Sequence, residues 1–204
     1  MEQFAIIAAA HFLALLIPGV DFFLIVRTAI SRGRRSAVAV CLGIAAANAA
    51  VIAAAFTGMT LLSDPSALAF TQVVGGLFLL VVGVNILRHS NTVDVETGIA
   101  RDTGARPWIR YLGLGATSAV LNPKNVLFYV SLAAVVAAAD PGAKVFYGVW
   151  MTSVVLVWDT LVALVMTSRL ARQRLALLLP WVSRIAGAFL IFFGAGMLAG
   201  WAMT

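Results

Sequence analysis

Six long apolar stretches constrain the fold of this 204-residue chain more than any other feature. A helix needs about 20 mostly apolar residues to cross the hydrocarbon core of a bilayer. The stretches cover roughly residues 3–29, 37–62, 68–88, 111–138, 144–167 and 181–202. They are continuously apolar rather than alternating, which favours helices over the strands of a membrane β-barrel. We therefore predict an all-α integral membrane protein with six transmembrane helices.

The overall composition agrees with this prediction and argues against a soluble enzyme. The chain is 62% apolar and only 11% charged, whereas soluble domains are about 45–50% apolar and about 25% charged. Its mean hydropathy is +1.02. Cys41 is the only cysteine, so the chain has no intrachain disulfide and no thiol pair for a metal.

The arginines predict the orientation in the membrane. Twelve of the 14 Lys and Arg residues follow the first, third and fifth apolar stretches. Because cytoplasmic connections carry the excess of positive charge, we predict that both termini lie outside. This topology explains the net charge of +6 through contacts with anionic lipids, without a nucleic-acid partner. The acidic start of the chain also predicts that no signal peptide is cleaved.

The longest polar segment, residues 89–110, divides the chain into two similar parts. Residues 1–88 and 111–204 each contain three of the six stretches. Because three is odd, the two parts must run through the membrane in opposite senses. This arrangement is typical of secondary transporters built from inverted repeats. We predict a single transporter domain in which two three-helix repeats are joined by a cytoplasmic linker.

The first helix of each repeat is interrupted near its middle. Pro18 and Gly19 interrupt the first stretch, and Asn122 and Pro123 interrupt the fourth. Proline removes a helical hydrogen bond, while Asn and Pro suit the N-cap and first position of a new helix. Each break lies about 12 residues from the cytoplasmic end of its stretch, so we expect both near the membrane midplane. We also expect Asp21 to accept hydrogen bonds from the amides that the first break frees.

Three charged residues lie near the middle of the apolar stretches. Asp21 and Lys124 lie at the two breaks, and Asp159 lies in the middle of the fifth stretch. A charge at the bilayer centre costs about 2.5–3.5 kcal/mol, and such residues usually mark substrate or proton pathways. We predict that all three bind substrate or couple protons. The alternative for the first two is a neutralising Asp–Lys pair at a structural kink.

Other polar and small residues of the stretches have simpler interpretations. Asn48 serves either the binding site or a hydrogen bond between helices, and we include it among the candidate site residues. We interpret His11 as a packing residue. Small residues such as Gly43, Gly83 and Gly187 predict close helix packing, within one subunit or between the subunits of a homodimer.

Two groups of motifs connect the chain to a known family. The first group is IPGVD, RGRR and LGI at residues 17–21, 32–35 and 42–44, and the second is LNPK and LFY at residues 121–124 and 127–129. They are similar to the PGPD…GRRxG…LG and NPK-xx-LF runs of the LysE/RhtB family of bacterial amino-acid exporters. The chain resembles this family over nearly its whole length, although Val20 replaces the usual second proline of the first motif.

The resemblance implies export of amino acids or related small metabolites across the bacterial inner membrane, driven by the proton gradient. It also implies a homodimer, and it implies no cofactor. The positions that match the motifs of the family, and that the resemblance makes functional, are Pro18, Gly19, Asp21, Asn122, Pro123 and Lys124.

These residues suggest a mechanism. The substrate carboxylate would bind Lys124 and the first amides of the helix after the second break, since helix N-termini attract anions. The substrate amine would bind Asp21 or Asp159. Burial favours the protonated form of a carboxyl group, so either residue would also exchange a proton, and rocking of the two repeats would alternate access.

Two other functions compete with amino-acid export. A metal-cation exporter of the same superfamily would need several soft ligands inside the stretches, and the chain offers Cys41 and His11 without ligand spacing. An integral membrane enzyme that modifies lipids would need a nucleophile or metal set near the headgroups. The sequence contains no such motif, so we expect that the protein is not an enzyme.

Overall fold

The computed structural model describes residues 2–61, 65–89 and 107–202, and within these ranges it contains eight α-helices and no strand. The prediction of an all-α fold is therefore confirmed. Most of the expected 89–110 linker lies outside the described residues. The helices are α1 (Glu2–Leu16), α2 (Val20–Arg32), α3 (Arg34–Leu61), α4 (Pro65–His89), α5 (Trp108–Leu121), α6 (Pro123–Val135), α7 (Pro141–Val165) and α8 (Arg169–Ala202).

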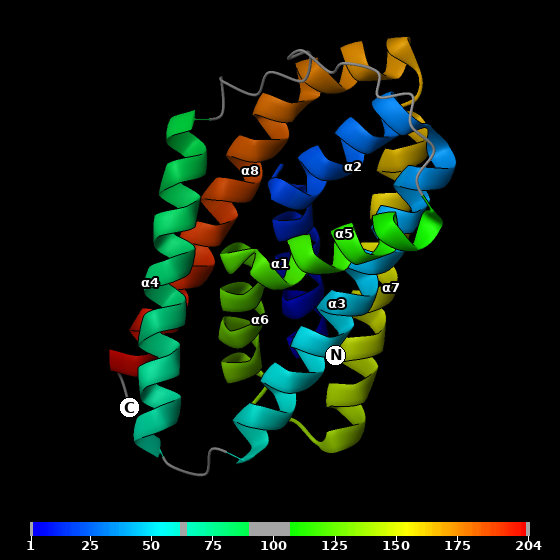
Figure 1. The fold of residues 1–204 in the computed structure, drawn as a ribbon. Coiled ribbons are helices and arrows are strands. Elements are labelled where there is room, and N and C mark those ends of the chain that lie inside the picture. The colour runs from blue at the N-terminus through cyan, green and yellow to red at the C-terminus, as the bar shows by residue number, and fades with distance from the viewer. Residues whose placement is uncertain (1, 62–64, 90–106, 203–204) are drawn as a thin grey trace.

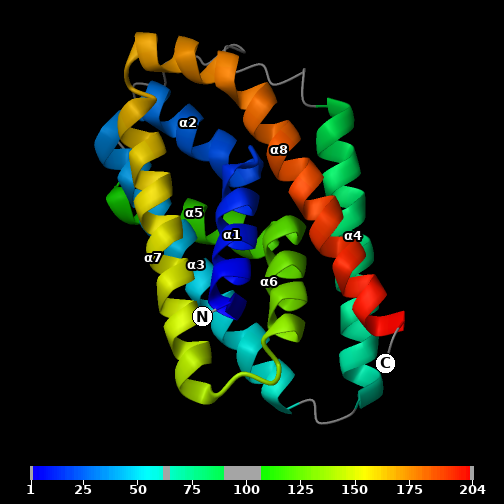
Figure 2. The same cartoon turned by 180° about the vertical axis from the view of Figure 1, so that it is seen from behind.

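The helices form a bundle with two outer pairs and a middle layer (Figure 1). The first pair is α4 with α8, and the second is α3 with α7. Between these pairs lie α1 and α6, which pack against helices of both (Figure 2). Two short helices, α2 and α5, pack against the half of α3 that contains its N-terminus. The middle layer thus consists of α1, which ends at the first helix break, and α6, which begins at the second.

Five elements have the length and hydropathy of membrane spans. Four are single helices or parts of helices: Arg34–Gly58, Ala69–Arg88, Pro141–Val165 and Ser183–Ala202. The fifth is the pair α1 and α2, which the first break bends by 51°. In contrast, α5 lies across the bundle, and α6 continues from it at a steep angle, so that the two do not form one straight span (Figure 1). The sixth span and the inverted repeat therefore remain predictions.

The segment between the last two spans contains Arg169 to Arg174 and Pro180, as the sequence predicts. This segment is largely helical, because α8 begins at Arg169 and contains Pro180. The turn lies earlier, at residues 166–168. Leucine and alanine residues precede the proline and have high helix propensity, so the single bond that proline removes does not end the helix.

Glycines allow the closest helix contacts, as the sequence predicts. A Cβ atom at Gly43 of α3 would collide with the backbone of α5 at Leu112, and one at Gly115 would collide with Val40. Between α4 and α8, a Cβ atom at Gly83 would lie 2.7 Å from the carbonyl oxygen of Gly187. These glycines pack within one chain. The homodimer therefore stays a prediction that their positions do not support.

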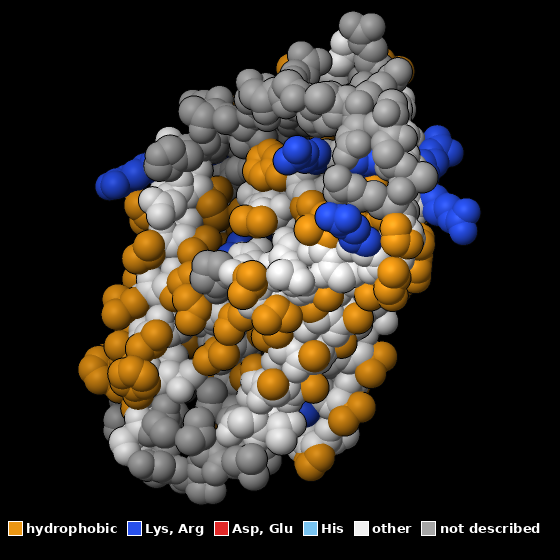
Figure 3. All heavy atoms as spheres, viewed as in Figure 1, with side chains coloured by type: hydrophobic (Ala, Val, Ile, Leu, Met, Phe, Trp, Pro, Cys, Tyr) orange, Lys and Arg blue, Asp and Glu red, His pale blue; other side chains and the backbone are white. Residues whose placement is uncertain are grey.

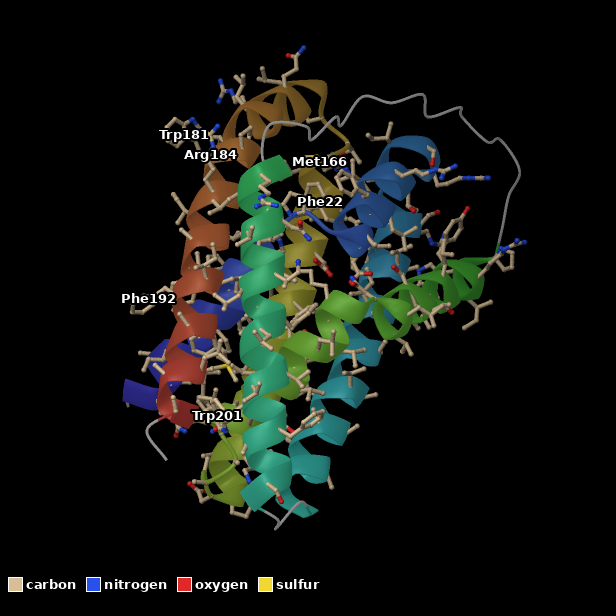
Figure 4. All side chains as sticks on the ribbon, turned by 90° about the vertical axis from the view of Figure 1, so that its left-hand side faces the viewer. Phe22, Met166, Trp181, Arg184, Phe192 and Trp201 are labelled. Atoms are coloured by element: carbon tan, nitrogen blue, oxygen red, sulfur yellow. The ribbon has the colours of Figure 1, made fainter. Side chains whose placement is uncertain are left out.

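The outer surface suits a lipid environment. Apolar side chains cover much of the face in Figure 3, while Lys and Arg side chains gather towards one end of it. Phe192 is 76% exposed and lies on the outer side of α8, as Trp181 does (Figure 4). Arg184 lies over the ring of Trp181, with 5.3 Å between the guanidinium carbon and the ring centroid. Exposed apolar surface of this extent is expected only where lipid covers it.

Buried apolar residues form two clusters, one on each side of the breaks. The first contains residues of α1, α6, α8 and the N-terminal half of α7. The second contains residues of α2, α5 and the C-terminal half of α7. The two ends of α3 contribute to different clusters. Polar side chains lie between the clusters, at the level of the two breaks.

Candidate functional site

The first break leaves the start of α2 without a cap. Gly19 occupies the N-cap position in an extended conformation and has no side chain to offer. Phe23 donates its backbone N–H to the Gly19 carbonyl oxygen over 3.1 Å, which is the first bond of the helix. In the described part of the chain, no side chain accepts from the preceding amides of Val20, Asp21 and Phe22. The first amides of a helix normally need such a partner. The prediction that Asp21 accepts from them is wrong, because its carboxylate bonds to α5 and α6 instead.

The second break is closed by its own residues, as the sequence predicts. The side-chain oxygen of Asn122 accepts the backbone N–H of Lys124 over 3.1 Å, and Pro123 occupies the first turn of α6. The amides of Asn125 and Val126 donate to the carbonyl oxygen of Asn122 over 3.0 and 3.3 Å. Because proline has no amide hydrogen, none of the first amides of α6 is left without a partner.

The ionisable residue of each break bonds to the other break. Lys124 donates from Nζ to the carbonyl oxygens of Ala14 and Ile17, both over 3.1 Å, at the end of α1. Asp21 accepts from side chains of α5 and α6. Among the described residues, Lys124 makes no ion pair with Asp21. The arrangement is therefore an exchange of partners between the breaks, not a simple Asp–Lys pair.

Lys124 keeps one of its donors available. An ammonium group has three N–H donors, and two of them bond to the carbonyl oxygens of α1. The partial negative charge at the end of a helix favours a cation there. A Cβ atom at Gly19 would lie 3.6 Å from Nζ, so this glycine places the ammonium group beside the uncapped start of α2. An anion at this point would meet a cation and free amides.

Asp21 is held by three side-chain donors. Its Oδ1 accepts from the Ser118 hydroxyl over 2.6 Å, and its Oδ2 accepts from the side-chain amides of Asn122 and Asn125 over 3.1 and 2.6 Å. Asn125 also donates to the Asn48 side-chain oxygen over 3.3 Å. This network, the Asp21 network, joins α2, α3, α5 and α6. Both oxygens of the carboxylate are engaged in it.

Asp159 faces the same site from α7 and has no such partners. Its side chain is only 6% exposed, and no hydrogen bond joins it to any residue in the described part of the chain. Lys124 and Asp21 line the same cavity. Because an isolated buried charge is costly, this carboxyl group needs a proton or a cationic partner.

The predicted site residues line one cavity of about 50 Å³. A water molecule needs about 10–15 Å³ of such space, and ligand pockets usually have about 300–1,000 Å³. The cavity therefore holds a few waters in this conformation and must widen for a larger ligand. The candidates that line it are Gly19, Asp21, Asn48, Asn122, Lys124 and Asp159. The two predicted prolines, Pro18 and Pro123, lie in the breaks beside it.

The sequence analysis assigned no functional role to four residues of this region. Ser118 bonds to Asp21, and Asn125, Tyr129 and His11 line the cavity. Helix spacing could have found most of them, since residues four apart share a face. Ser118 lies four residues before Asn122, and Tyr129 lies four after Asn125. His11, interpreted as a packing residue, is buried among aromatic rings, but its Nδ1 has no hydrogen-bond partner.

Both breaks and nearly all of the helices fall within one family match. A sequence profile described as LysE type translocator matches residues 12–200. The chain belongs to the LysE type translocator family. This finding confirms the resemblance seen in the motifs. With the apolar helices, it makes this translocator a multi-pass membrane protein.

Threonine efflux proteins are similar to this translocator over nearly their whole length, and a leucine efflux protein is similar over about half of its length. The threonine efflux protein of Escherichia coli (strain K12) is 27% identical over 199 residues, which are 96% of this chain and 97% of that protein. The threonine efflux protein of Salmonella typhimurium is 27% identical over 97% of this chain and 98% of its own. The leucine efflux protein of Klebsiella pneumoniae is 29% identical over 57% of this chain and 55% of its own. No solved structure matches the chain closely enough to count as similar.

Proposed function

We propose that this translocator exports amino acids from the cytoplasm and binds them in the cavity where the two breaks meet. The observation that carries the proposal is a pair of opposite charges. Lys124 has a spare donor and Asp159 has no hydrogen-bond partner, and both line the same cavity. An amino acid is a zwitterion that matches such a pair. The relatives named threonine and leucine efflux proteins support the same substrate class.

The carboxylate of the substrate binds at the start of α2. There it accepts the third N–H of Lys124 and the free amides that follow Gly19. The N-terminal end of a helix favours an anion. The start of α6 is the weaker candidate, because its amides already bond to Asn122.

The amine of the substrate binds Asp159, and this step couples transport to protons. From outside, a proton binds the Asp159 carboxylate and neutralises it. From the cytoplasm, the substrate ammonium group displaces that proton, which leaves as the ion pair forms. One site then carries either a proton inward or a substrate outward, and this exchange is antiport. Asp21 is a positioning residue in this scheme, because three donors already hold its carboxylate.

Transport requires the cavity to open to each side in turn. The cavity of about 50 Å³ corresponds to a closed state, and rocking of the halves around the breaks opens it. The protein acts in the bacterial inner membrane, with both termini outside and with lipids around its apolar faces.

Efflux from proteoliposomes tests the proposal. Vesicles that contain the purified protein are loaded with a mixture of amino acids, a pH gradient is imposed, and mass spectrometry quantifies every species. We expect selective loss of one or a few amino acids, dependent on the gradient. Lys124→Gln and Asp159→Asn should each reduce this loss about 100-fold, since the two charges bind the substrate. Folding is checked by size-exclusion chromatography.

Matched variants control for the change of charge. Lys144→Gln removes a lysine outside the cavity. Asp140→Asn removes a carboxylate that caps α7, and asparagine caps a helix equally well. Both controls should transport like the wild type. Export of no amino acid by folded protein would refute the proposal, and full gradient-driven export by Asp159→Asn would refute its coupling step.

A further inference from the structure

Apart from the charged residues Lys124 and Asp159, two groups of polar residues line the cavity. Asp21, Asn48, Asn122 and Asn125 bond to one another. On the side of α1 and α6, however, His11 and Tyr129 line the cavity without hydrogen bonds to any described residue. The first group joins α2, α3 and α6 through hydrogen bonds. The polar atoms of the second group are available to a ligand in the cavity.

His11 and Tyr129 are buried, and buried polar side chains without hydrogen bonds are uncommon. They are 2% and 4% exposed, and Nδ1 of His11 has no partner. Their ring centroids are 6.1 Å apart. Buried polar side-chain atoms nearly always have a partner, and one without a partner costs about 1–3 kcal/mol. The unpartnered imidazole nitrogen of His11 and the nearby Tyr129, both on the cavity wall, are therefore groups to which a polar substrate atom could bond.

The position of His11 on α1 indicates which part of a substrate would reach it. His11 lies three residues before Ala14, whose carbonyl oxygen accepts Lys124 Nζ. Residues three apart lie on one face of a helix, and a rise of 1.5 Å per residue separates them by about 4.5 Å along the axis. A substrate whose carboxylate is held at Lys124 would thus place its first side-chain atoms near His11.

We propose that His11 and Tyr129 form a side-chain subsite that selects small amino acids with a hydroxyl group close to the α-carbon. A hydroxyl both donates and accepts, so it can bond to an imidazole nitrogen and to the Tyr129 hydroxyl at once. An aliphatic side chain would leave both residues unsatisfied. This inference rests on the proposed function and adds the substrate class to it.

Two pairs of amino acids that differ by a hydroxyl group test the subsite in the unmodified protein. Threonine and valine differ by a hydroxyl in place of a methyl group, and serine and alanine differ by one hydroxyl. A pocket without hydrogen-bonding groups separates such pairs poorly, whereas a site built to bond a hydroxyl rejects its analogue strongly. We expect proteoliposomes to export threonine over valine, and serine over alanine, by about 100-fold or more. Equal export within both pairs would overturn the inference.

Variants that keep an aromatic ring but remove its polar atoms test whether His11 and Tyr129 cause this selectivity. His11→Phe and Tyr129→Phe remove the polar atoms, and each should lower the threonine-to-valine ratio at least tenfold, mainly through slower threonine export. Tyr147→Phe is the matched control, because this buried tyrosine of α7 does not line the cavity. It should leave the ratio unchanged.

The outcomes for the subsite and for the transporter are distinguishable. If either ring variant exports amino acids with the wild-type ratio, the subsite is wrong while amino-acid export stands. If the wild type exports no amino acid of any kind, the proposed function itself fails. Should one variant not fold, the other variant and the two amino-acid pairs still test the subsite.

Discussion

The two breaks look alike in the sequence but differ in how their new helices begin. At the second break, Asn122 caps α6 and every early amide of that helix has a partner. At the first break, Gly19 contributes no cap and the early amides of α2 stay free. Each break also supplies the charge that binds the other: Lys124 bonds to α1, and Asp21 bonds to α5 and α6.

This difference separates a structural role from a binding role. The closed second break can hold its shape without a ligand, since Asn122 caps it and the early amides of α6 all have partners. The open first break keeps donors beside a cation, which is the arrangement that an anion requires. We infer that the first break binds the substrate and the second break positions the groups around it.

The largest expected effect concerns the carboxylate that joins the two breaks. Asp21→Ala leaves the Ser118, Asn122 and Asn125 donors without their acceptor, so it should lower the free energy of unfolding by about 3 kcal/mol or more. Asp21→Asn should cost only about 1 kcal/mol. The introduced amide can still accept from the two asparagines and donate to the serine hydroxyl. Thermal unfolding in detergent measures both.

Transport then tests whether the charge of Asp21 matters in itself. If Asp21 only positions its neighbours, Asp21→Asn should keep at least about a tenth of wild-type export, because its hydrogen bonds survive. Complete loss of export in a stable Asp21→Asn protein would show that the charge or proton of Asp21 is needed for transport. Asp21 would then share the role that we assign to Asp159 and would not be a positioning residue alone.

The sequence predicted the parts of this site that depend on local chemistry. The cap of α6 follows from Asn122 and Pro123, and the meeting of the breaks follows from their equal distance to the ends of their stretches. The partners of Asp21 and Lys124 could not be predicted, because they depend on how α5 crosses the bundle. That crossing depends in turn on contacts between Gly43, Gly115 and the facing backbone, which a single sequence does not specify.

A smaller effect is expected at the closed break. Asn122→Ala removes both the cap of α6 and one donor to Asp21, and should lower the free energy of unfolding by about 2–3 kcal/mol. Asn122→Ser keeps a capping oxygen and loses only the donor, so about 1 kcal/mol of that loss should return. Equal unfolding temperatures for the two variants would mean that the cap contributes nothing to the closed state of this break.

The smallest change in stability, and the sharpest test of the comparison, comes from closing the open break. Gly19 has an extended backbone with φ −132°, which any residue adopts, and a Cβ atom there makes only ordinary contacts, at 3.6 Å or more from Lys124. Gly19→Asn would place a capping oxygen over the free amides of α2. It should therefore raise the free energy of unfolding by about 0.5 kcal/mol.

The same cap should compete with the substrate carboxylate. We expect Gly19→Asn to raise the substrate concentration for half-maximal efflux about tenfold, although the protein becomes more stable. Gly19→Ala adds the Cβ atom without a cap and should change this concentration less than twofold. Most variants that weaken a transporter also destabilise it, so opposite signs in stability and transport point to binding at these amides. If the asparagine and alanine variants transport alike, the carboxylate does not bind at the start of α2, and the two breaks differ in structure alone.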